Sequence, residues 1–268
     1  MNKRTYLMES DAEAARLEHK TDFERLAQQA RWAGIGPGMR VADIGCGSGK
    51  TTNFLHHLVQ PGGTAVGVDA SEGRLAHARE HFPAPGIEYV RRDFYQPLGG
   101  IGTFDFIWVR FVLEYHKEAA ASIVRHLLDI LNPGGILCLI DLDYNCLSHY
   151  GLSARLDRAI GGVIGHLEAT ADFDPYMGRK LYSLMYDLGL EEIRVDMAAH
   201  HLIVGELSAV DAENWLAKLE VAAKNSGYPF SEYAGGFDEF RQEFTSFFHD
   251  PRRFTYTPLI VCRGRKTG

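Results

Sequence analysis

The chain has 268 residues, of which 46% are hydrophobic and 24% charged, as is ordinary for a globular protein with room for one large α/β domain. A formal net charge of −7 argues against a nucleic-acid partner, because polyanion binders usually carry a basic face. The N-terminus is too polar for a signal peptide, and no apolar run approaches the roughly 18 residues of a membrane span. We therefore expect a cytoplasmic protein with no membrane partner. Four scattered cysteines without a C-x-x-C pair predict reduced thiols rather than disulfides or a zinc site.

The first predicted element is a helix over residues 9–33, which carries a loose apolar stripe. Ser10 followed three residues later by Glu13 is typical of a helix N-terminus. The glycines and proline of residues 34–38 should end the helix.

A buried strand is predicted at Val41 to Ile44, and the loop Gly45-Cys46-Gly47-Ser48-Gly49 follows it directly. Residues 50–59 carry apolar pairs that suit a helix on a sheet. Strand, glycine turn and helix N-terminus together predict a ligand cradle, because free N–H groups point out of the helix end.

The spacing of the loop distinguishes between three ligands. A dinucleotide fingerprint needs a third glycine where Lys50 stands. A phosphate loop ending in Gly49-Lys50-Thr51 needs its first glycine where Ile44 stands, so the loop is one residue short. What remains is G-x-G-x-G after a strand that ends in an acid, Asp43.

Further strands alternate with helices. The strand Thr64 to Asp69 ends in an acid about 20 residues beyond the glycines, where a ribose-binding carboxylate belongs. Helix 117–131 precedes a turn at Asn132-Pro133-Gly134-Gly135. This rhythm predicts right-handed crossovers and a parallel sheet covered on both faces, with further strands at residues 87–93, 103–110 and 136–142.

Five motifs stand in order over residues 39–142: V-x-D-I-G-C-G-S-G, V-D-A-S, R-R-D-F, F-D-F-I-W-V-R-F-V-L-E-Y-H and L-N-P-G-G-I-L. In this order and at these separations they resemble the class I S-adenosylmethionine (SAM) dependent methyltransferases of the small-molecule type. The resemblance implies an α/β fold with a doubly wound, seven-stranded, mostly parallel sheet, in which strand 7 is antiparallel. It also implies SAM as cofactor and S-adenosylhomocysteine as product.

The second half of the chain fits the same fold with additions. A helix around Leu181 closed by Gly189 and strands at 192–204 and 255–262 complete the sheet, although Pro258 cannot donate to a strand ladder. Helical lid insertions are expected at about 150–170 and 206–250, over the crevice at the strand ends. Their apolar stripes are equally compatible with ordinary packing surface. We expect a single methyltransferase domain over residues 1–268, divided into an N-terminal helical cap (1–38), a SAM-binding half (39–144) and a substrate-side half (145–268).

The resemblance also implies roles for single residues. Asp43 would face the ammonium of SAM, Asp69 both ribose hydroxyls and Asp93 the adenine amino group. Arg110 follows strand four, where the family usually offers a backbone carbonyl; its guanidinium is equally suited to face the acceptor or an acid. The expected SAM-binding residues are Tyr6, Arg16, Asp43, Gly45, Cys46, Gly47, Gly49, Asp69, Ala70, Asp93, Phe94 and Arg110.

Methyl transfer from a sulfonium is an in-line displacement from an activated donor, so positioning supplies most of the catalysis. A general base is needed only if the acceptor must lose a proton first. His116 and Tyr115 are the candidate catalytic residues, with Asp141, Asp143, Tyr144 and His149 as further candidates. No metal is expected, because Arg110 stands where metal-dependent relatives need an acid.

The leading hypothesis is SAM-dependent methyl transfer to a small-molecule acceptor, apolar or aromatic in view of the aromatic-rich insertion. The alternatives are a catalytically inactive SAM-binding module that acts as a sensor or partner subunit, and a nucleotide-binding α/β enzyme. The glycine spacing disfavours the last. The sequence leaves open the acceptor, the methylated atom and the choice between monomer and homodimer.

Overall fold

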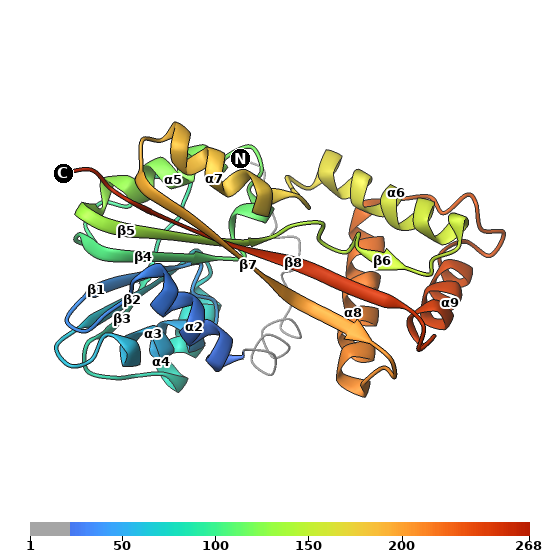
Figure 1. Cartoon of the computed structure of the whole chain (residues 1–268), viewed down its shortest axis with the longest axis horizontal. Helices are drawn as coiled ribbons and strands as arrows, with labels where there is room; N and C mark the ends of the chain where they lie inside the picture. The colour runs from blue at the N-terminus through green and yellow to red at the C-terminus, as the bar shows by residue number, and fades with distance from the viewer. Residues whose placement is uncertain (1–21) are drawn as a thin grey trace.

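A computed structural model describes residues 22–268 and contains an eight-stranded sheet in the order β3-β2-β1-β4-β5-β8-β6, with β7 paired to β8 (Figure 1). The strands are β1 (Arg40–Ile44), β2 (Thr64–Asp69), β3 (Ile87–Arg91), β4 (Phe104–Arg110), β5 (Leu131–Leu142), β6 (His149–Tyr150), β7 (Glu191–Val204) and β8 (Phe254–Arg265). The pairs among β1 to β5 are parallel, and β8 runs antiparallel to β5 and β7. The predicted doubly wound, mostly parallel sheet is therefore confirmed. The short β6 is an eighth strand that the prediction lacked.

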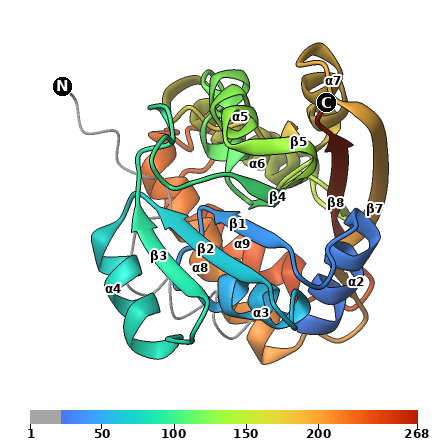
Figure 2. The same cartoon turned by 90° about the vertical axis from the view of Figure 1, so that its left-hand side faces the viewer.

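Helices cover both faces of this sheet, as its alternating apolar side chains require. Val41 and Trp108 pack on α2 and α3, whereas Ile44 and Val109 pack on the face that carries α5 and α7 (Figure 2). The helices are α2 (Phe23–Ala33), α3 (Lys50–Leu58), α4 (Glu72–His81), the 3₁₀ turn η1 (Leu113–Tyr115), α5 (Ala120–Asp129), α6 (Ala154–Thr170), α7 (Met177–Asp187), α8 (Ala209–Ser226) and α9 (Gly236–Phe248).

The prediction of one continuous helix over residues 9–33 is wrong, because Asp22 is not helical. The backbone of Asp22 is extended, and its side chain accepts hydrogen bonds from the N–H groups of Glu24 and Arg25, so a helix begins at Phe23. Aspartate favours this position because its carboxylate satisfies N–H groups that a helix N-terminus leaves unpaired. The predicted cap at Ser10 and Glu13 lies outside the described residues.

Two irregularities explain why strand boundaries differ from those predicted. The pairing of β4 with β5 shifts register between Phe104 and Phe106, so the Asn132-to-Gly135 turn is accommodated within β5. The pairing of β7 with β8 shifts between Ala199 and His201, next to the partner of Pro258. A bulge at this point tolerates a residue that cannot donate to the ladder.

The inserted helices α6, α8 and α9 form a separate apolar cluster that includes Ile203 of β7. This cluster lies beside β6 and the far ends of β7 and β8 (Figure 1). Trp215, Phe240, Phe244 and Phe248 are buried there, each 3% exposed or less. Because β7 and β8 are 14 and 12 residues long, they run out of the main sheet and carry this cluster beside it. None of the helices within residues 22–268 is both long and apolar enough to cross a membrane.

Candidate cofactor and acceptor site

The glycine loop leaves the carboxyl end of β1 and is fixed to β2. The N–H groups of Gly45 and Cys46 both donate to the carbonyl of Val68, at 2.8 and 3.0 Å. Gly45, Gly47 and Gly49 all have positive φ, of 75°, 53° and 84°. A Cβ on Gly45 would lie 2.5 Å from a methyl of Val112, whereas a Cβ on Gly47 would meet nothing within 4 Å. The middle of the loop therefore offers an open backbone surface that a ligand can approach closely.

Asp69 holds this open part of the loop in place. Its Oδ2 accepts a hydrogen bond from Gly47 N at 3.0 Å, and its Oδ1 accepts one from Ser71 N at 2.9 Å. The residue is 5% exposed and ends β2, and the carbonyl of the neighbouring Ala70 accepts from Arg91 Nε at 3.2 Å. An ionised carboxylate has about four acceptor positions, so the two backbone contacts leave capacity for two hydroxyl groups.

Asp43 lies beside the loop, where α3 begins. It is 3% exposed, and its Oδ2 accepts a hydrogen bond from Thr52 Oγ1 at 2.7 Å. Burial raises the pKa of this carboxyl to about 7, and the charge of Asp69 adds to the rise, while Thr52 and Arg110 oppose it. Asp43 is therefore poised to become ionised when a cation reaches it. Cys46, by contrast, has a thiol pKa raised by burial, which fits a small space-filling side chain rather than a nucleophile.

The third acid, Asp93, lies in the loop after β3 rather than at the end of the strand. It is exposed, and its Oδ1 accepts a hydrogen bond from Tyr95 N at 3.0 Å. The next residue, Phe94, is buried, and its carbonyl accepts from His126 Nδ1 at 3.1 Å. The side chain of Asp93 thus keeps oxygens available at the edge of the site.

Arg110 ends β4 next to this group of acids. Its guanidinium lies 4.0 Å from the ring centroid of Phe111, and its buried Nε has no hydrogen-bond partner among the described residues. Burial lowers the pKa of Arg110 to about 10, although Asp43 and Asp141 act in the opposite direction. Arg110 thus interacts electrostatically with Asp43 and Asp141, but within the described part of the chain it forms no ion pair with either.

The two predicted catalytic residues contact different parts of the molecule. His116 Nδ1 lies 2.6 Å from Tyr95 Oη, so His116 is tied to the loop that carries Asp93. The ring of Tyr115 packs on Phe173 at 5.7 Å, between α6 and α7. The structure therefore places His116 towards the loop after β3 and Tyr115 towards the inserted helices.

Three of the further base candidates, Asp143, Tyr144 and His149, have side-chain partners. Arg179 donates to both carboxylate oxygens of Asp143, at 2.8 and 2.9 Å, and stacks on Tyr144 at 4.4 Å. His149 is buried against Trp215, bonds Thr255 Oγ1 at 2.9 Å, and has its pKa lowered by burial to about 4. A neutral, enclosed imidazole of this kind stabilises the insertion rather than serving as a base near pH 7.

The sequence did not predict a buried polar network of Glu114, Asn145 and Lys218 next to η1. Asn145 Nδ2 donates to Glu114 Oε2 at 2.8 Å, and Lys218 Nζ donates to Asn145 Oδ1 at 2.7 Å. Burial raises the pKa of Glu114 to about 7, and Lys218 opposes this. Asp141 accepts from Leu113 N at 3.1 Å through one oxygen, while its other oxygen has no partner among the described residues. The only sequence signal was the position of Glu114 inside the motif F-V-L-E-Y-H.

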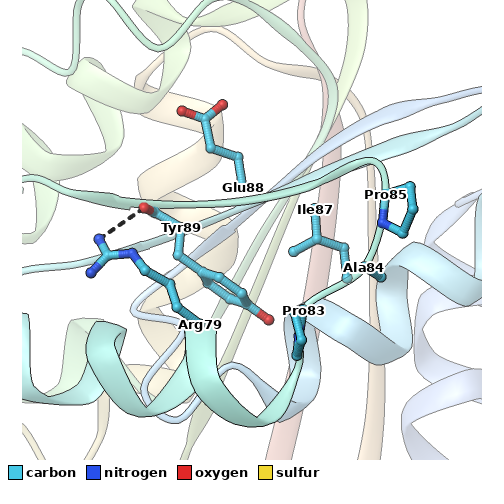
Figure 3. A pocket seen from close by; sticks show the side chains of 7 residues that line it. All are labelled: Arg79, Pro83, Ala84, Pro85, Ile87, Glu88 and Tyr89. Atoms are coloured by element: carbon cyan, nitrogen blue, oxygen red, sulfur yellow. Dashed lines mark hydrogen bonds between the residues drawn. The ribbon is translucent and has the colours of Figure 1, made fainter.

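A hollow of about 550 Å³ lies elsewhere, towards the amino end of the edge strand β3 (Figure 3). Its walls come from the end of α4 and from β3, where Arg79 donates to the carbonyl of Tyr89 at 3.1 Å. Since ligands of open α/β sheets bind at the carboxyl ends of the strands, this hollow is not part of the candidate site. It is lined by Arg79, Pro83, Ala84, Pro85, Ile87, Glu88 and Tyr89.

A mostly parallel sheet with an open glycine loop after its first strand and a buried acid at the end of its second is typical of Rossmann-like folds. Residues 41–135 match the methyltransferase domain family. This part of the chain is therefore similar to the class I methyltransferases, the family whose cofactor is SAM. Within residues 22–268 no group of three histidine, cysteine or acidic side chains is arranged to hold a metal ion.

Three known proteins illustrate the similarity. An uncharacterized methyltransferase of Synechocystis is 35% identical over 126 residues, which are 46% of this chain and 53% of the relative. A ubiquinone biosynthesis O-methyltransferase of Dinoroseobacter shibae is 36% identical over 40% of this chain and 43% of its own length. Thus the chain matches about half the length of these relatives. A phosphoethanolamine N-methyltransferase of Haemonchus contortus, solved with SAM, has the same fold, with a TM-score of 0.53 at 16% identity over 91% of this chain and 52% of that one.

Proposed function

We propose that this protein transfers a methyl group from SAM to a small-molecule acceptor by in-line displacement at the sulfonium. The observation that carries this proposal is the pairing of Asp69 with the open Gly47 backbone. It supports a cradle for an adenosine ligand without the extra residue that a phosphate loop requires.

The residues around the cradle fit the parts of SAM one by one. In this proposal Asp69 accepts from the ribose hydroxyls, Asp43 faces the ammonium, and Asp93 with the Phe94 backbone contacts adenine. Tyr6 and Arg16 remain proposed cofactor contacts that lie outside the described residues. The loop residues Gly45, Cys46, Gly47 and Gly49, with Ala70, would form the wall along the ligand.

Catalysis in this proposal rests mainly on position and on exclusion of water. The insertions around 150–170 and 206–250 would cover the methyl group and shape the acceptor pocket as part of a single domain. His116 or Tyr115 would accept a proton if the acceptor carries one. Their different contacts favour Tyr115 for an acceptor under the insertion, because its ring faces the cluster of α6, α8 and α9.

The class of acceptor is proposed from two sources. The aromatic insertion suits an apolar or aromatic molecule, and one matched relative is named for an O-methylation in ubiquinone biosynthesis. A nucleic acid is disfavoured by the net charge of −7. The protein would act as a monomer or homodimer.

Titration calorimetry tests the ligand class. We expect binding of SAM and S-adenosylhomocysteine and little heat from NAD or from ATP with magnesium. Comparable affinity for ATP would refute the proposal. A screen of metabolite pools with methyl-labelled SAM then separates an enzyme from an inactive module, since the module binds SAM and labels nothing.

A further inference from the structure

The edge of the sheet at β7 has no strand partner within the described residues. Among residues 22–268, β7 pairs with β8 on one side and with no other strand, and it is the outermost strand beside β8 in Figure 2. It is 14 residues long. Natural proteins usually shorten or cover such an edge, because its unpaired N–H and C=O groups readily pair with another strand. The open edge therefore indicates a surface that another chain can cover.

Pro258 shows which backbone groups of β7 face this edge. Pro258 has no N–H, and its carbonyl accepts a hydrogen bond from Asp143 N at 3.0 Å, on the β5 side of β8. Its partner on β7, Ala199, therefore directs its own N–H and C=O groups away from β8. Because these directions alternate along a strand, Val195 and Met197 do the same. The edge thus presents a regular row of donors and acceptors.

Exposed apolar side chains flank the open edge on one face of the sheet. Val195 and Met197 of β7 are 49% and 69% exposed. Ile193, which shares their face of the strand, packs against the same core cluster as α7. On α7 itself Tyr182 and Tyr186 are 47% and 67% exposed, and their rings stack at 6.2 Å. Large apolar side chains that gather in this way favour a protein interface.

The two tyrosines lie on the flank of α7 that faces β7. On the opposite flank Lys180 bonds Asp174, which is tied to the backbone of η1. Between the flanks the helix contacts β8, where Met185 Sδ lies 3.5 Å from Cys262 Sγ. With 3.6 residues per turn, the tyrosine positions continue this rotation beyond β8. Helix and strand therefore contribute to one surface.

The charges on the other face of β7 favour a second copy of this chain as the partner. Arg194 and Asp196 are exposed on that face and form no ion pair within residues 22–268. When two β7 strands pair antiparallel about Val195, the Arg194 of each chain lies directly opposite the Asp196 of the other. The edge is therefore complementary to itself, as a two-fold interface requires.

Other registers of the same pairing are disfavoured. Pairing about Asp196 would place two like charges directly opposite each other, which is destabilising. Pairing about Met197 would bring Val195 against Ala199, whose carbonyl already accepts from Arg25 Nη1 at 2.6 Å. Both the charges and the hydrogen bond of Arg25 thus favour Val195 as the centre.

We propose that β7 forms the interface of a homodimer, in which two copies pair antiparallel about Val195 and the sheet continues from one protomer into the other. The tyrosines of the two α7 helices cover the apolar strip on one face, and two pairs of Arg194 with Asp196 form on the other. The interface does not depend on which ligand the glycine loop binds. It selects the homodimer from the two oligomeric states left open above.

Sedimentation velocity of charge-reversal variants tests the interface. The unmodified protein should sediment at micromolar concentration with twice the 29.9 kDa mass of one chain. Arg194→Asp or Asp196→Arg places like charges opposite each other twice, so each should raise the dimer dissociation constant by about ten- to hundredfold. An equimolar mixture of the two variants should form a heterodimer, because its charges are complementary again. The control Arg125→Asp, at an exposed arginine of α5, should leave the mass unchanged.

Val195→Pro tests the backbone pairing separately. Proline removes an N–H group that points to the open edge, so the ladder to β8 should persist, as circular dichroism would show, while the dimer is lost. If this variant does not fold, the mixture of charge-reversal variants decides. A monomeric unmodified protein would overturn the inference, and so would a dimer that both charge reversals leave unchanged. Failure of the mixture to restore the dimer would also overturn it, because Arg194 and Asp196 would then not be opposite each other.

Discussion

Replacement of Asp69 by asparagine is the most direct test of the cofactor cradle. Asparagine has nearly the same shape, but it has one acceptor oxygen and one N–H₂ donor where the carboxylate has two acceptors. In the folded protein the two oxygens face Gly47 N and Ser71 N. One of these N–H groups will therefore face another donor.

Two effects of Asp69→Asn can be given magnitudes. A hydrogen bond to a charged group contributes about 1.5–3 kcal/mol, so the loss of one backbone contact should lower the free energy of unfolding by about 2 kcal/mol. The ribose hydroxyls lose an ionised acceptor as well, which should weaken binding of S-adenosylhomocysteine by roughly ten- to several-hundred-fold, at about 1.4 kcal/mol per tenfold. Turnover at saturating SAM should fall much less, because ribose contacts are alike in ground and transition states.

Asp105→Asn provides the matched control. Asp105 also accepts a backbone hydrogen bond, from Arg40 N at 2.9 Å, but at the amino end of the sheet. Denaturant unfolding should show a loss of stability for both variants, whereas calorimetry should show weakened binding of S-adenosylhomocysteine for Asp69→Asn alone. Normal binding with lost turnover in Asp69→Asn would mean that Asp69 faces the acceptor, and the cradle would be wrongly placed.

The remaining predictions concern ionisation and the link to the insertion. SAM affinity should rise between about pH 6 and pH 8, because Asp43, with a pKa of about 7, must release its proton to meet an ammonium; calorimetry in two buffers of different ionisation enthalpy should detect that proton, and Asp43→Asn should abolish it. In the ligand-free protein, protonated Asp43 stabilises the folded state fully below about pH 4, and this stabilisation is lost as the pH rises to about 7. The free energy of unfolding should therefore fall less over this range in Asp43→Asn than in the unmodified protein. Lys218→Met should loosen η1 without weakening the binding of S-adenosylhomocysteine, as hydrogen exchange and calorimetry would show.

The sequence predicted the strands and helices around the glycine loop well because the signals there are local. The strand before Gly45, the glycine spacing and Asp69 all follow from residues within one βαβ unit, where periodicity and turn chemistry decide the structure. The network of Glu114, Asn145 and Lys218 was not predictable in this way. Its hydrogen bonds join residues 31 and 73 positions apart, and two of its members lie in a loop and on an inserted helix. Only the folded chain brings them together.

That network links the candidate active site to the insertion, and Lys218 is the residue through which the link can be broken. Lys218 lies on α8, and its hydrogen bond to Asn145 and its charge both favour the ionised form of Glu114. Without that charge, as in Lys218→Met, the pKa of Glu114 should rise further, and Asn145 loses a donor at a buried oxygen. Because Glu114 also accepts through its carbonyl from Asp174 N at 2.8 Å, loosening should spread to the amides of 113–116 and raise their exchange rates. Lys224→Met, at an exposed lysine of the same helix, should have no such effect. Unchanged exchange in Lys218→Met would show that the insertion is merely packed beside the site, and the proposed lid would lose its connection to residues 113–116.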